Sequence, residues 1–239
     1  MLATRSELIE RLELICGRDN VVYDAAGLSV YDYDASDETI AGSHRALVTV
    51  LPGSADEVVE IVRVANAYSL PVTARGAGTG LAGGAIAARG GIMIVLTRMT
   101  RILEVNEIDR YAIVEPGLIN LDLSTALAGQ GYFFAPDPAS QRACTIGGNV
   151  ANNSGGPHCL KYGVTSNHVL GLEVVLPSGE LLWVGGASAE MPGYDLTGAL
   201  VGSEGTLGIV TRAMVRLTRK PEAVAVLLAA FTSVDAASR

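Results

Sequence analysis

The residues best suited to chemistry are the glycines of segment 71–84, which reads PVTARGAGTGLAGG. Glycine loses more backbone entropy on folding than any other residue, so a cluster of five within residues 76–84 needs a compensating role. Glycines allow backbone N–H groups to approach a phosphate closely and donate to it. The segment therefore predicts a phosphate- or pyrophosphate-binding loop, and the alternative is a flexible surface loop.

Two further segments combine glycines with small polar residues. The second glycine segment, 144–156, reads CTIGGNVANNSGG, and the third, 202–210, reads GSEGTLGIV. Taken singly, the second is also typical of a helix start with a polar loop after it, and the third of a tight turn. Together with 71–84 they predict one extended ligand, which lies across the domain and is contacted by backbone and small polar groups.

The stretch GTGLAG at 78–83 formally matches the dinucleotide-binding pattern G-x-G-x-x-G. A Rossmann fold also needs an uninterrupted helix directly after this pattern and an acidic residue at the end of the next strand. Gly84 and the pair at 90–91 interrupt any such helix, and the next strand runs into Thr97 and Arg98. These features disfavour a Rossmann fold.

Strands and a helix alternate around the first glycine segment. We expect a strand over 46–51, a helix from the capping box of Ser54 and Glu57 to about residue 68, and a strand over 71–74. This order gives a βαβ unit of minimal size, and the glycine loop follows its second strand.

The rest of the chain favours antiparallel strand pairs with short helices. We expect strands over 91–96, 101–105, 111–115, 170–176, 180–184, 208–217 and 223–231, and helices over 4–15, 120–128, 145–153 and 195–200. Residues 21–44 show no clear period and predict a wrapping segment with little regular structure. The chain is therefore expected to be α+β, with one small βαβ-like half and one antiparallel-sheet half.

Composition limits the functions open to the chain. Its 239 residues carry a net charge of −8 without a Lys/Arg cluster, which disfavours nucleic-acid binding. The three cysteines, Cys16, Cys144 and Cys159, match no metal motif and favour reduced thiols in a cytoplasmic protein. The longest apolar runs fall well short of the roughly 20 residues of a membrane span, so no integral membrane segment is expected.

Six motifs occur in one order along the chain: RGAGTGLAGG at 75–84, VEPG at 114–117, PDP at 136–138, TIGG with NNSG within 145–155, KYG at 161–163, and GSEGTLGI at 202–209. The series resembles the FAD-binding domain of the vanillyl-alcohol oxidase / p-cresol methylhydroxylase superfamily. Within it, the chain looks like the FAD-linked 2-hydroxyacid oxidoreductases, which include glycolate oxidase D subunits and D-lactate dehydrogenases. The resemblance covers about residues 40–220 and implies the two-subdomain FAD-binding fold of that superfamily.

The resemblance also implies cofactor-binding residues. The residues expected at the FAD pyrophosphate are Arg75, Gly76, Ala77, Gly78, Thr79, Gly80 and Gly84. The residues expected along the flavin and ribityl chain are Pro116, Asp137, Thr145, Gly148 and Asn152. The residues expected at the rest of the cofactor, including its adenosine end, are Tyr162, Glu204, Gly208 and Ile209.

Some members of the superfamily attach the flavin covalently through a histidine in the glycine loop. Here the loop carries Thr79 and no histidine, which predicts noncovalent FAD. The three histidines are His44, His158 and His168. His158 follows the second glycine segment and is able to approach the flavin, but an ordinary hydrogen-bonded or solvent-facing histidine is favoured.

The domain boundaries follow from the motifs and the resemblance. We expect an N-terminal helix and wrapping segment over 1–41, the FAD-binding domain over 42–219, and the start of a truncated substrate domain over 220–239. In the superfamily, the histidines that bind a metal or transfer protons lie in that later domain. The chain itself shows no nucleophile–base arrangement and no metal cluster, so no catalytic or metal-binding residue is assigned to it.

The implied function is the FAD-binding part of an oxidoreductase that oxidises a 2-hydroxyacid of the glycolate or D-lactate type. Hydride would pass to flavin N5, and electron-accepting partner subunits are possible. Two alternatives stay open. The chain is then either a flavin-binding module without activity of its own, or a relative of the enolpyruvyl-sugar reductases. The second alternative is disfavoured by the stretch NNSGG at 152–156 and by the tail.

Overall fold

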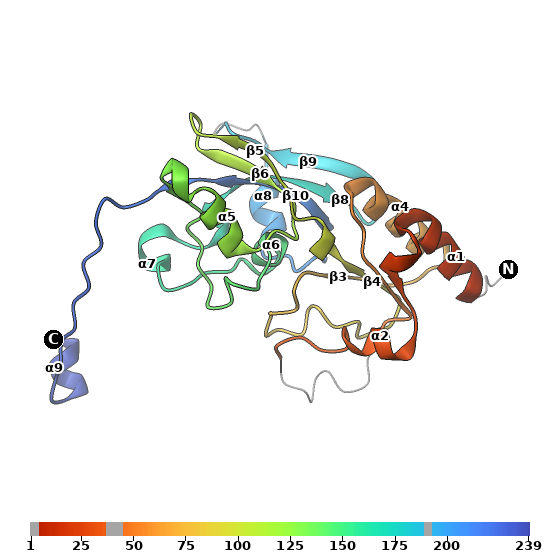
Figure 1. The fold of residues 1–239 in the computed structure, drawn as a ribbon, viewed down its shortest axis with the longest axis horizontal. Coiled ribbons are helices and arrows are strands. Elements are labelled where there is room, and N and C mark those ends of the chain that lie inside the picture. Colours follow the sequence, from red (N-terminus) through yellow and green to blue (C-terminus); the bar gives the residue numbers. More distant parts are fainter. Residues whose placement is uncertain (1–4, 37–44, 189–192) are drawn as a thin grey trace.

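The computed structural model describes residues 5–36, 45–188 and 193–239. Two subdomains are built on separate sheets (Figure 1). The first has a four-stranded sheet in the order β1-β2-β4-β3, and the second has a five-stranded sheet in the order β5-β6-β10-β8-β9. The expected α+β architecture with one βαβ-like half and one antiparallel half is confirmed.

In the first subdomain two strands run parallel to a central one, and a short strand is antiparallel at the edge. The strands are β1 (Val21–Val22), β2 (Val48–Val50), β3 (Val72–Arg75) and β4 (Ile92–Val95). The predicted βαβ unit is β2-α4-β3, and β4 is inserted between its two strands. Every residue of β2 and β4 is buried, as is typical of parallel strands covered on both faces.

Two helices, α1 (Arg5–Cys16) and α4 (Ala55–Ala67), share a core with this sheet. Helix α4 begins as its sequence predicts, because the Ser54 hydroxyl accepts a hydrogen bond from the Glu57 N–H at 3.2 Å. The Glu57 carboxylate in turn accepts one from the Gly53 N–H at 2.8 Å. The residues on the apolar face of the helix are buried, among them Val58, Ile61, Val62 and Ala65.

The second subdomain is an antiparallel sheet with helices on its buried face. Its strands are β5 (Ile102–Asn106), β6 (Tyr111–Val114), β8 (Val169–Val175), β9 (Leu181–Gly185) and β10 (Ile209–Arg216). The helices that share its core are α5 (Asn120–Ala126), α6 (Ile146–Asn152) and α8 (Leu196–Leu200). The two strand pairs and the long strand expected here are confirmed.

The two subdomains are joined through a shared core. Val175, at the end of β8, and Ile209, at the start of β10, are buried in the apolar cluster of the first subdomain. The hydrogen-bond pairing of these two residues in the sheet ties this contact to the second subdomain. The loop that follows β3 is therefore held at a fixed position relative to the elements of the second subdomain.

The segment between residues 21 and 44 is more regular than expected. It forms β1 and a short helix, α2 (Ala25–Ser29), so the prediction of little regular structure is wrong for residues 21–36. The helix is only five residues long, too short to show a period. It begins because the Asp24 carboxylate accepts hydrogen bonds from the N–H groups of Ala26 and Gly27. Residues 37–44, including His44, lie outside the described residues, as does Thr4.

Smaller elements complete the chain. Strand β7 (Tyr132–Phe133) pairs with β11 (Thr218–Arg219). Helix α7 (Cys159–Tyr162) follows the second glycine segment, and α9 (Val234–Ser238) closes the chain. The three cysteines are free thiols, as expected, and burial raises the pKa of Cys16 to about 12.

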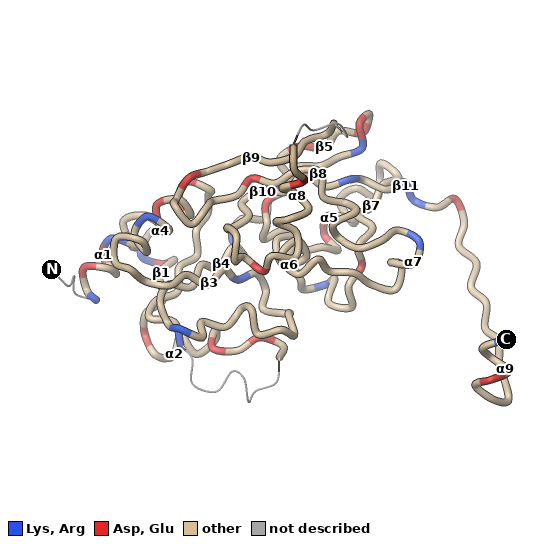
Figure 2. Tube along the Cα trace, turned by 180° about the vertical axis from the view of Figure 1, so that it is seen from behind, with Lys and Arg blue, Asp and Glu red and all other residues tan. Residues whose placement is uncertain are grey.

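The strand expected over 223–231 is wrong. The segment runs away from the body of the protein without strand structure (Figures 1 and 2), and Leu228 is 99% exposed. The segment has the apolar composition of a strand. A strand also needs a neighbour to pair with, however, and no described strand lies beside this segment. Helix α9 begins at its cap Ser233, whose hydroxyl accepts a hydrogen bond from the Ala236 N–H at 3.2 Å.

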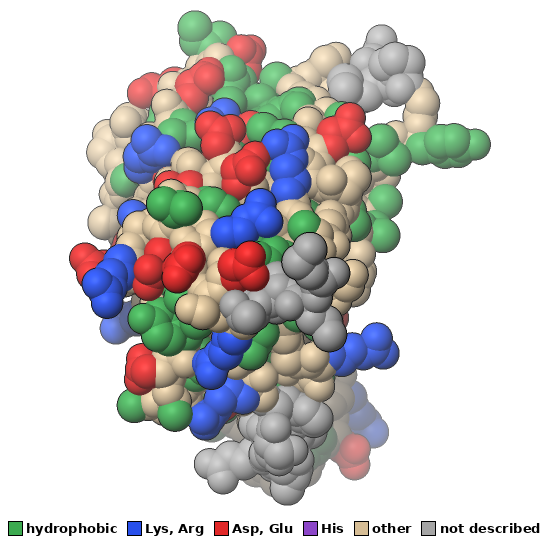
Figure 3. Space-filling model, turned by 90° about the vertical axis from the view of Figure 1, so that its right-hand side faces the viewer, with side chains coloured by type: hydrophobic (Ala, Val, Ile, Leu, Met, Phe, Trp, Pro, Cys, Tyr) green, Lys and Arg blue, Asp and Glu red, His purple; other side chains and the backbone are tan. Residues whose placement is uncertain are grey.

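The surface carries charges of both signs. In the view of Figure 3, Lys and Arg side chains alternate with Asp and Glu side chains and form no broad basic patch on that face. None of the helices among the described residues is long and apolar enough to cross a membrane. Because the charges are mixed, an anionic ligand must be held by local groups rather than by a positive surface field.

The core of the first subdomain gives a test of the fold. Ile61 is fully buried in it, whereas Leu14 of α1 is 87% exposed. We expect Ile61→Ala to lower the free energy of unfolding by about 2–5 kcal/mol, because it removes packed methyl groups and leaves a cavity. Leu14→Ala is the matched control and is expected to change it by about 0.5 kcal/mol or less. Denaturant unfolding measures both, and equal effects would contradict the described core.

Candidate functional site

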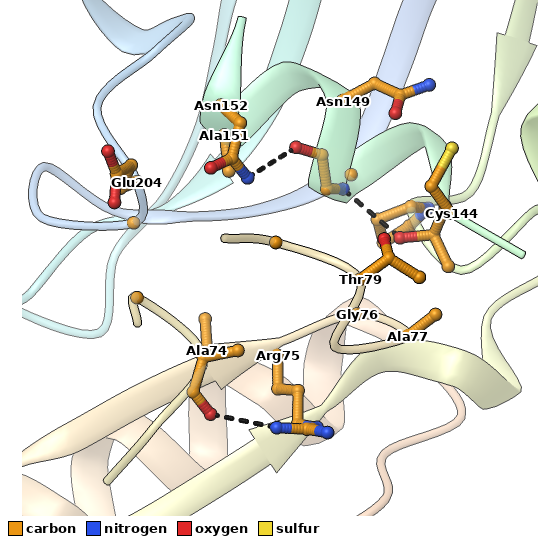
Figure 4. A pocket seen from close by; sticks show the side chains of 18 of the residues that line it. Ala74, Arg75, Gly76, Ala77, Thr79, Cys144, Asn149, Ala151, Asn152 and Glu204 are labelled. Carbon is orange, nitrogen blue, oxygen red and sulfur yellow. Dashed lines mark hydrogen bonds between the residues drawn. The ribbon is translucent and has the colours of Figure 1, made fainter. Parts of the chain in front are cut away.

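A pocket of about 280 Å³ lies between the two subdomains (Figure 4). Its walls come from the glycine loop after β3, from α6 with the residues before it, and from the third glycine segment before β10. Of the sixteen residues expected at the cofactor, fourteen line it: Arg75, Gly76, Ala77, Gly78, Thr79, Gly80, Gly84, Pro116, Thr145, Gly148, Asn152, Glu204, Gly208 and Ile209. The three glycine segments, far apart in sequence, therefore meet at one site.

The glycine loop passes very close to the first turn of α6. A Cβ atom at position 76 would clash with Oγ1 of Thr145, and one at position 84 would come within 2.9 Å of a carboxylate oxygen of Glu204. Gly147 packs equally closely on the other side, where its Cβ would lie 2.7 Å from the Cβ of Pro116. Glycine is required at positions 76 and 84 because backbone meets side chains across the subdomain boundary, and at position 147 because α6 packs closely on Pro116.

Gly80 differs from these positions. A Cβ placed on it would meet no atom of the described residues within 4 Å, and its φ lies outside the left-handed region. The packing of the chain therefore gives no reason for glycine at position 80. Gly80 lines the pocket, so we expect a side chain at this position to occupy volume that a ligand needs.

Arg75 supports the loop from beneath. Its side chain is buried, its Nη1 donates to the carbonyl of Ala85 at 3.1 Å, and its guanidinium lies 5.9 Å from the ring centroid of Tyr31. Burial lowers the pKa of this guanidinium, while Asp34 opposes the shift. An arginine starts from so high a pKa that it stays charged. Gly78 leaves the room that the guanidinium fills, so a positive charge lies directly against the loop.

Helix α6 forms the opposite wall. The Thr145 hydroxyl accepts a hydrogen bond from the Gly148 N–H at 3.2 Å, and the Asn152 amide donates to the Gly148 carbonyl at 3.0 Å (Figure 4). Thr145 is thus the N-cap that starts the helix where the sequence predicts. Asn153 ends the helix in the left-handed conformation, with φ of 47°. The cap and the short helix together present Gly148 and Asn152 to the pocket.

The third wall contains a strained residue. Glu204 adopts φ of 50°, a left-handed conformation that costs a non-glycine residue roughly 1–2 kcal/mol. Its N–H donates to the Ala151 carbonyl at 2.9 Å, which fixes the turn beside the end of α6. The turn brings the exposed Glu204 carboxylate to the side of Gly84, so the end of α6, this turn and the glycine loop meet here.

Asp137 and Tyr162 do not line the pocket. They lie with His158, whose Nδ1 is 2.5 Å from an Asp137 carboxylate oxygen and whose ring centroid is 6.5 Å from that of Tyr162. The His158 side chain is exposed, so it is the hydrogen-bonded histidine that the sequence favours. The structure does not bring Asp137 and Tyr162 to the other fourteen residues, and their contact with a cofactor stays a prediction.

Several pocket residues were not selected from the sequence. The polar ones are Asp34, Ser140, Cys144, Asn149, Ser154 and Ser203. Asn149 is 1% exposed, and its Nδ2 has no acceptor among the described residues. Asn149 and Ser154 belong to the second glycine segment, so their polar side chains in that segment could have indicated them as site residues. Asp34 comes from the N-terminal segment, where nothing in the sequence points to a site.

The fold and the pocket define a class of protein. An alkyldihydroxyacetonephosphate synthase superposes on this chain with a TM-score of 0.82 at 25% identity over 92% of this chain and 42% of that one. p-Cresol methylhydroxylase shares the fold, with a TM-score of 0.74 at 21% identity over 91% of this chain and 44% of its own. The chain thus has the FAD-binding fold of the p-cresol methylhydroxylase type, as expected.

The family follows from sequence. The family model described as "FAD binding domain" matches residues 46–185, and the chain belongs to this family. It is 42% identical over 231 residues to the "Glycolate oxidase subunit GlcD" of Bacillus subtilis (strain 168), covering 96% of this chain and 48% of the relative. It is 36% identical over 230 residues to a "D-lactate dehydrogenase" of Anaerostipes hadrus, with coverage of 96% and 48%. The chain spans about half the length of these curated relatives.

The residues of the pocket fit the FAD that the family binds, and the FAD prediction is confirmed at the level of the family. The loop offers backbone N–H groups with an arginine beneath it, as a pyrophosphate requires. Gly80 leaves an unfilled space on the pocket side, and buried polar atoms of Asn149 and Asp34 lack partners among the described residues. A polar ligand would supply such partners.

Gly80 gives a sharp test of ligand position. We expect Gly80→Ala to leave the stability of the ligand-free protein unchanged but to weaken FAD binding about tenfold, because the added methyl enters space that the ligand occupies. Gly129→Ala is the matched control, since a Cβ there also meets no described atom within 4 Å and Gly129 does not line the pocket. Calorimetric titration with FAD and thermal unfolding measure the two effects. Unchanged FAD affinity in Gly80→Ala would place the cofactor elsewhere.

Proposed function

We propose that this chain is the FAD-binding part of an enzyme that oxidises a 2-hydroxyacid of the glycolate or D-lactate type. The observation that carries the proposal is the meeting of the three glycine segments at one pocket. The names of the related proteins support the substrate class. Bound FAD would supply the two-electron acceptor, which takes a hydride at flavin N5 from the carbinol carbon.

Each wall of the pocket would contact a different part of the cofactor. The N–H groups of residues 76–80 bind the pyrophosphate, and Arg75 adds positive charge from beneath the loop. Thr145, Gly148 and Asn152 line the flavin and ribityl region on the opposite wall. The residues assigned to the remaining part of the cofactor are Glu204, Gly208 and Ile209. Thr79 stands where covalent relatives carry a histidine, so the cofactor is bound noncovalently.

The substrate groups are assigned to a region beyond the FAD-binding domain. Oxidation of an alcohol releases a hydroxyl proton as well as a hydride, so it needs a base beside the substrate. Among the described residues no cluster of His, Cys, Asp or Glu could hold a metal ion. We assign residues 42–219 to the FAD-binding domain and residues 220–239 to the beginning of a substrate domain. An electron-accepting partner subunit would reoxidise the flavin.

Reconstitution tests the cofactor assignment. Purified protein incubated with FAD is expected to keep flavin absorbance through gel filtration, because the pocket holds the cofactor without the substrate domain. Acid precipitation is expected to release the flavin into the supernatant, since no covalent bond retains it. A colourless protein after incubation would contradict FAD binding, and flavin in the precipitate would contradict noncovalent attachment.

Dye reduction tests the division of labour. The reconstituted chain is expected to reduce no redox dye with glycolate or D-lactate, because the base and the substrate contacts lie outside it. A longer protein that continues through the substrate domain is expected to reduce the dye with one of these acids. Dithionite reduction of the bound flavin is the control for a competent cofactor. Turnover by the 239-residue chain would contradict this division, and an inactive longer protein would contradict the substrate class.

A further inference from the structure

Asp34 is a buried acid in the pocket wall with one oxygen satisfied and one not. It is 9% exposed and lines the pocket beside the glycine loop. Its Oδ1 accepts hydrogen bonds from the Ser36 N–H at 2.8 Å and from the Ser36 hydroxyl. Its Oδ2 is buried and has no donor among the described residues. A buried acceptor without a donor loses its hydration and gains nothing in return.

The segment that carries Asp34 is attached to the glycine loop. The Ala35 N–H donates to the Gly80 carbonyl at 3.1 Å, and the Tyr31 ring lies against the guanidinium of Arg75. These contacts bring a stretch that precedes the family match at 46–185 into the wall of the site. In Figure 1 this stretch follows α2 and runs below β3 and β4. The position of Asp34 is therefore fixed by the loop that binds the cofactor.

Arg75 does not satisfy the free oxygen of Asp34. The two side chains attract each other through space, but the hydrogen bond of the guanidinium goes to the Ala85 carbonyl. An ionised carboxylate only accepts hydrogen bonds, so Oδ2 needs a donor. A phosphate oxygen is not a donor and would be repelled by the carboxylate. The part of a ligand that suits Oδ2 is a sugar hydroxyl or an N–H group.

We propose that Asp34 Oδ2 accepts a hydrogen bond from a hydroxyl or N–H group of the bound dinucleotide, which makes Asp34 a further cofactor-binding residue. This inference rests on the proposed FAD binding. It assigns two kinds of ligand chemistry to neighbouring parts of one wall. The backbone of the glycine loop takes the negatively charged pyrophosphate, and Asp34 takes an uncharged donor next to it and disfavours phosphate there.

The substitution Asp34→Asn separates these roles. The Asn oxygen is expected to stay where it accepts from the Ser36 N–H, which places its NH₂ group at the position of Oδ2. The NH₂ group, a hydrogen-bond donor, then faces the donor group of the ligand, and no hydrogen bond can form between them. We expect FAD binding to weaken about tenfold or more, because a hydrogen bond to a charged group is lost. The affinity for inorganic pyrophosphate is expected to be unchanged or tighter, because a negative charge has been removed.

Calorimetric titration of the full chain with FAD, ADP, FMN and inorganic pyrophosphate measures these effects. A loss with ADP assigns the donor to the adenosine part, and a loss with FMN assigns it to the ribityl–flavin part. Asp32→Asn is the matched control, because Asp32 lies on the same segment but pairs with Arg45 outside the pocket. Asp32→Asn is expected to leave FAD affinity unchanged.

Two results would overturn the inference. One is unchanged FAD affinity in Asp34→Asn. The other is an equal loss for FAD and pyrophosphate, which would mean that Asp34 only holds the loop in place. If the variant does not fold, titration of the wild-type chain with deoxy and deamino analogues replaces it, and equal affinity for every analogue contradicts the inference. Failure of the wild-type chain to bind FAD would instead contradict the proposed function.

Discussion

The close approach of the glycine loop to the cap of α6 is the constraint on which the site depends. Position 76 has no room for a side chain, because the Thr145 hydroxyl occupies the place that a Cβ would need. The same hydroxyl accepts the hydrogen bond that starts α6. One atom therefore sets both the beginning of the helix and its distance from the loop. The pocket keeps its width because this contact and the shared core around Val175 and Ile209 act together.

Positive charge at the site comes from a nearby buried group rather than from the protein as a whole. The protein is acidic overall, with a net charge of −8, so its surface field opposes an anionic ligand. Arg75 offsets this at short range from a buried position, where neighbouring water does not screen it strongly. Its attraction to Asp34 limits the cost of burying both charges. Buried opposite charges and backbone N–H groups can thus hold a pyrophosphate in a protein without a basic surface.

Local signals were enough for some elements and not for others. The capping box of Ser54 and Glu57 predicted α4, because it acts within one helical turn. The helix expected over 145–153 is α6, and the structure shows that Thr145 caps it. The tail at 223–231 has a strand pattern but no described partner, and pairing cannot be read from one strand. The ordered glycine motifs indicated one site, but only the fold shows that Asp137 and Tyr162 lie apart from it. The sequence did not indicate Asp34 as a site residue, because its place in the pocket wall depends on tertiary contacts, and its own hydrogen bond to Ser36 is an ordinary local one.

Cofactor binding and catalysis are separable in this architecture. All three walls of the pocket come from residues within 34–210, and the two subdomains that supply them are joined where Val175 and Ile209 are buried in the core of the first. Gly76 and Gly84 contact Thr145 and Glu204 across the subdomain boundary, and all four residues lie within this range. If the substrate groups lie in a second domain, as we propose, they can change while the cofactor site stays fixed. This separation explains how relatives named for different reactions and substrates share one fold with this chain.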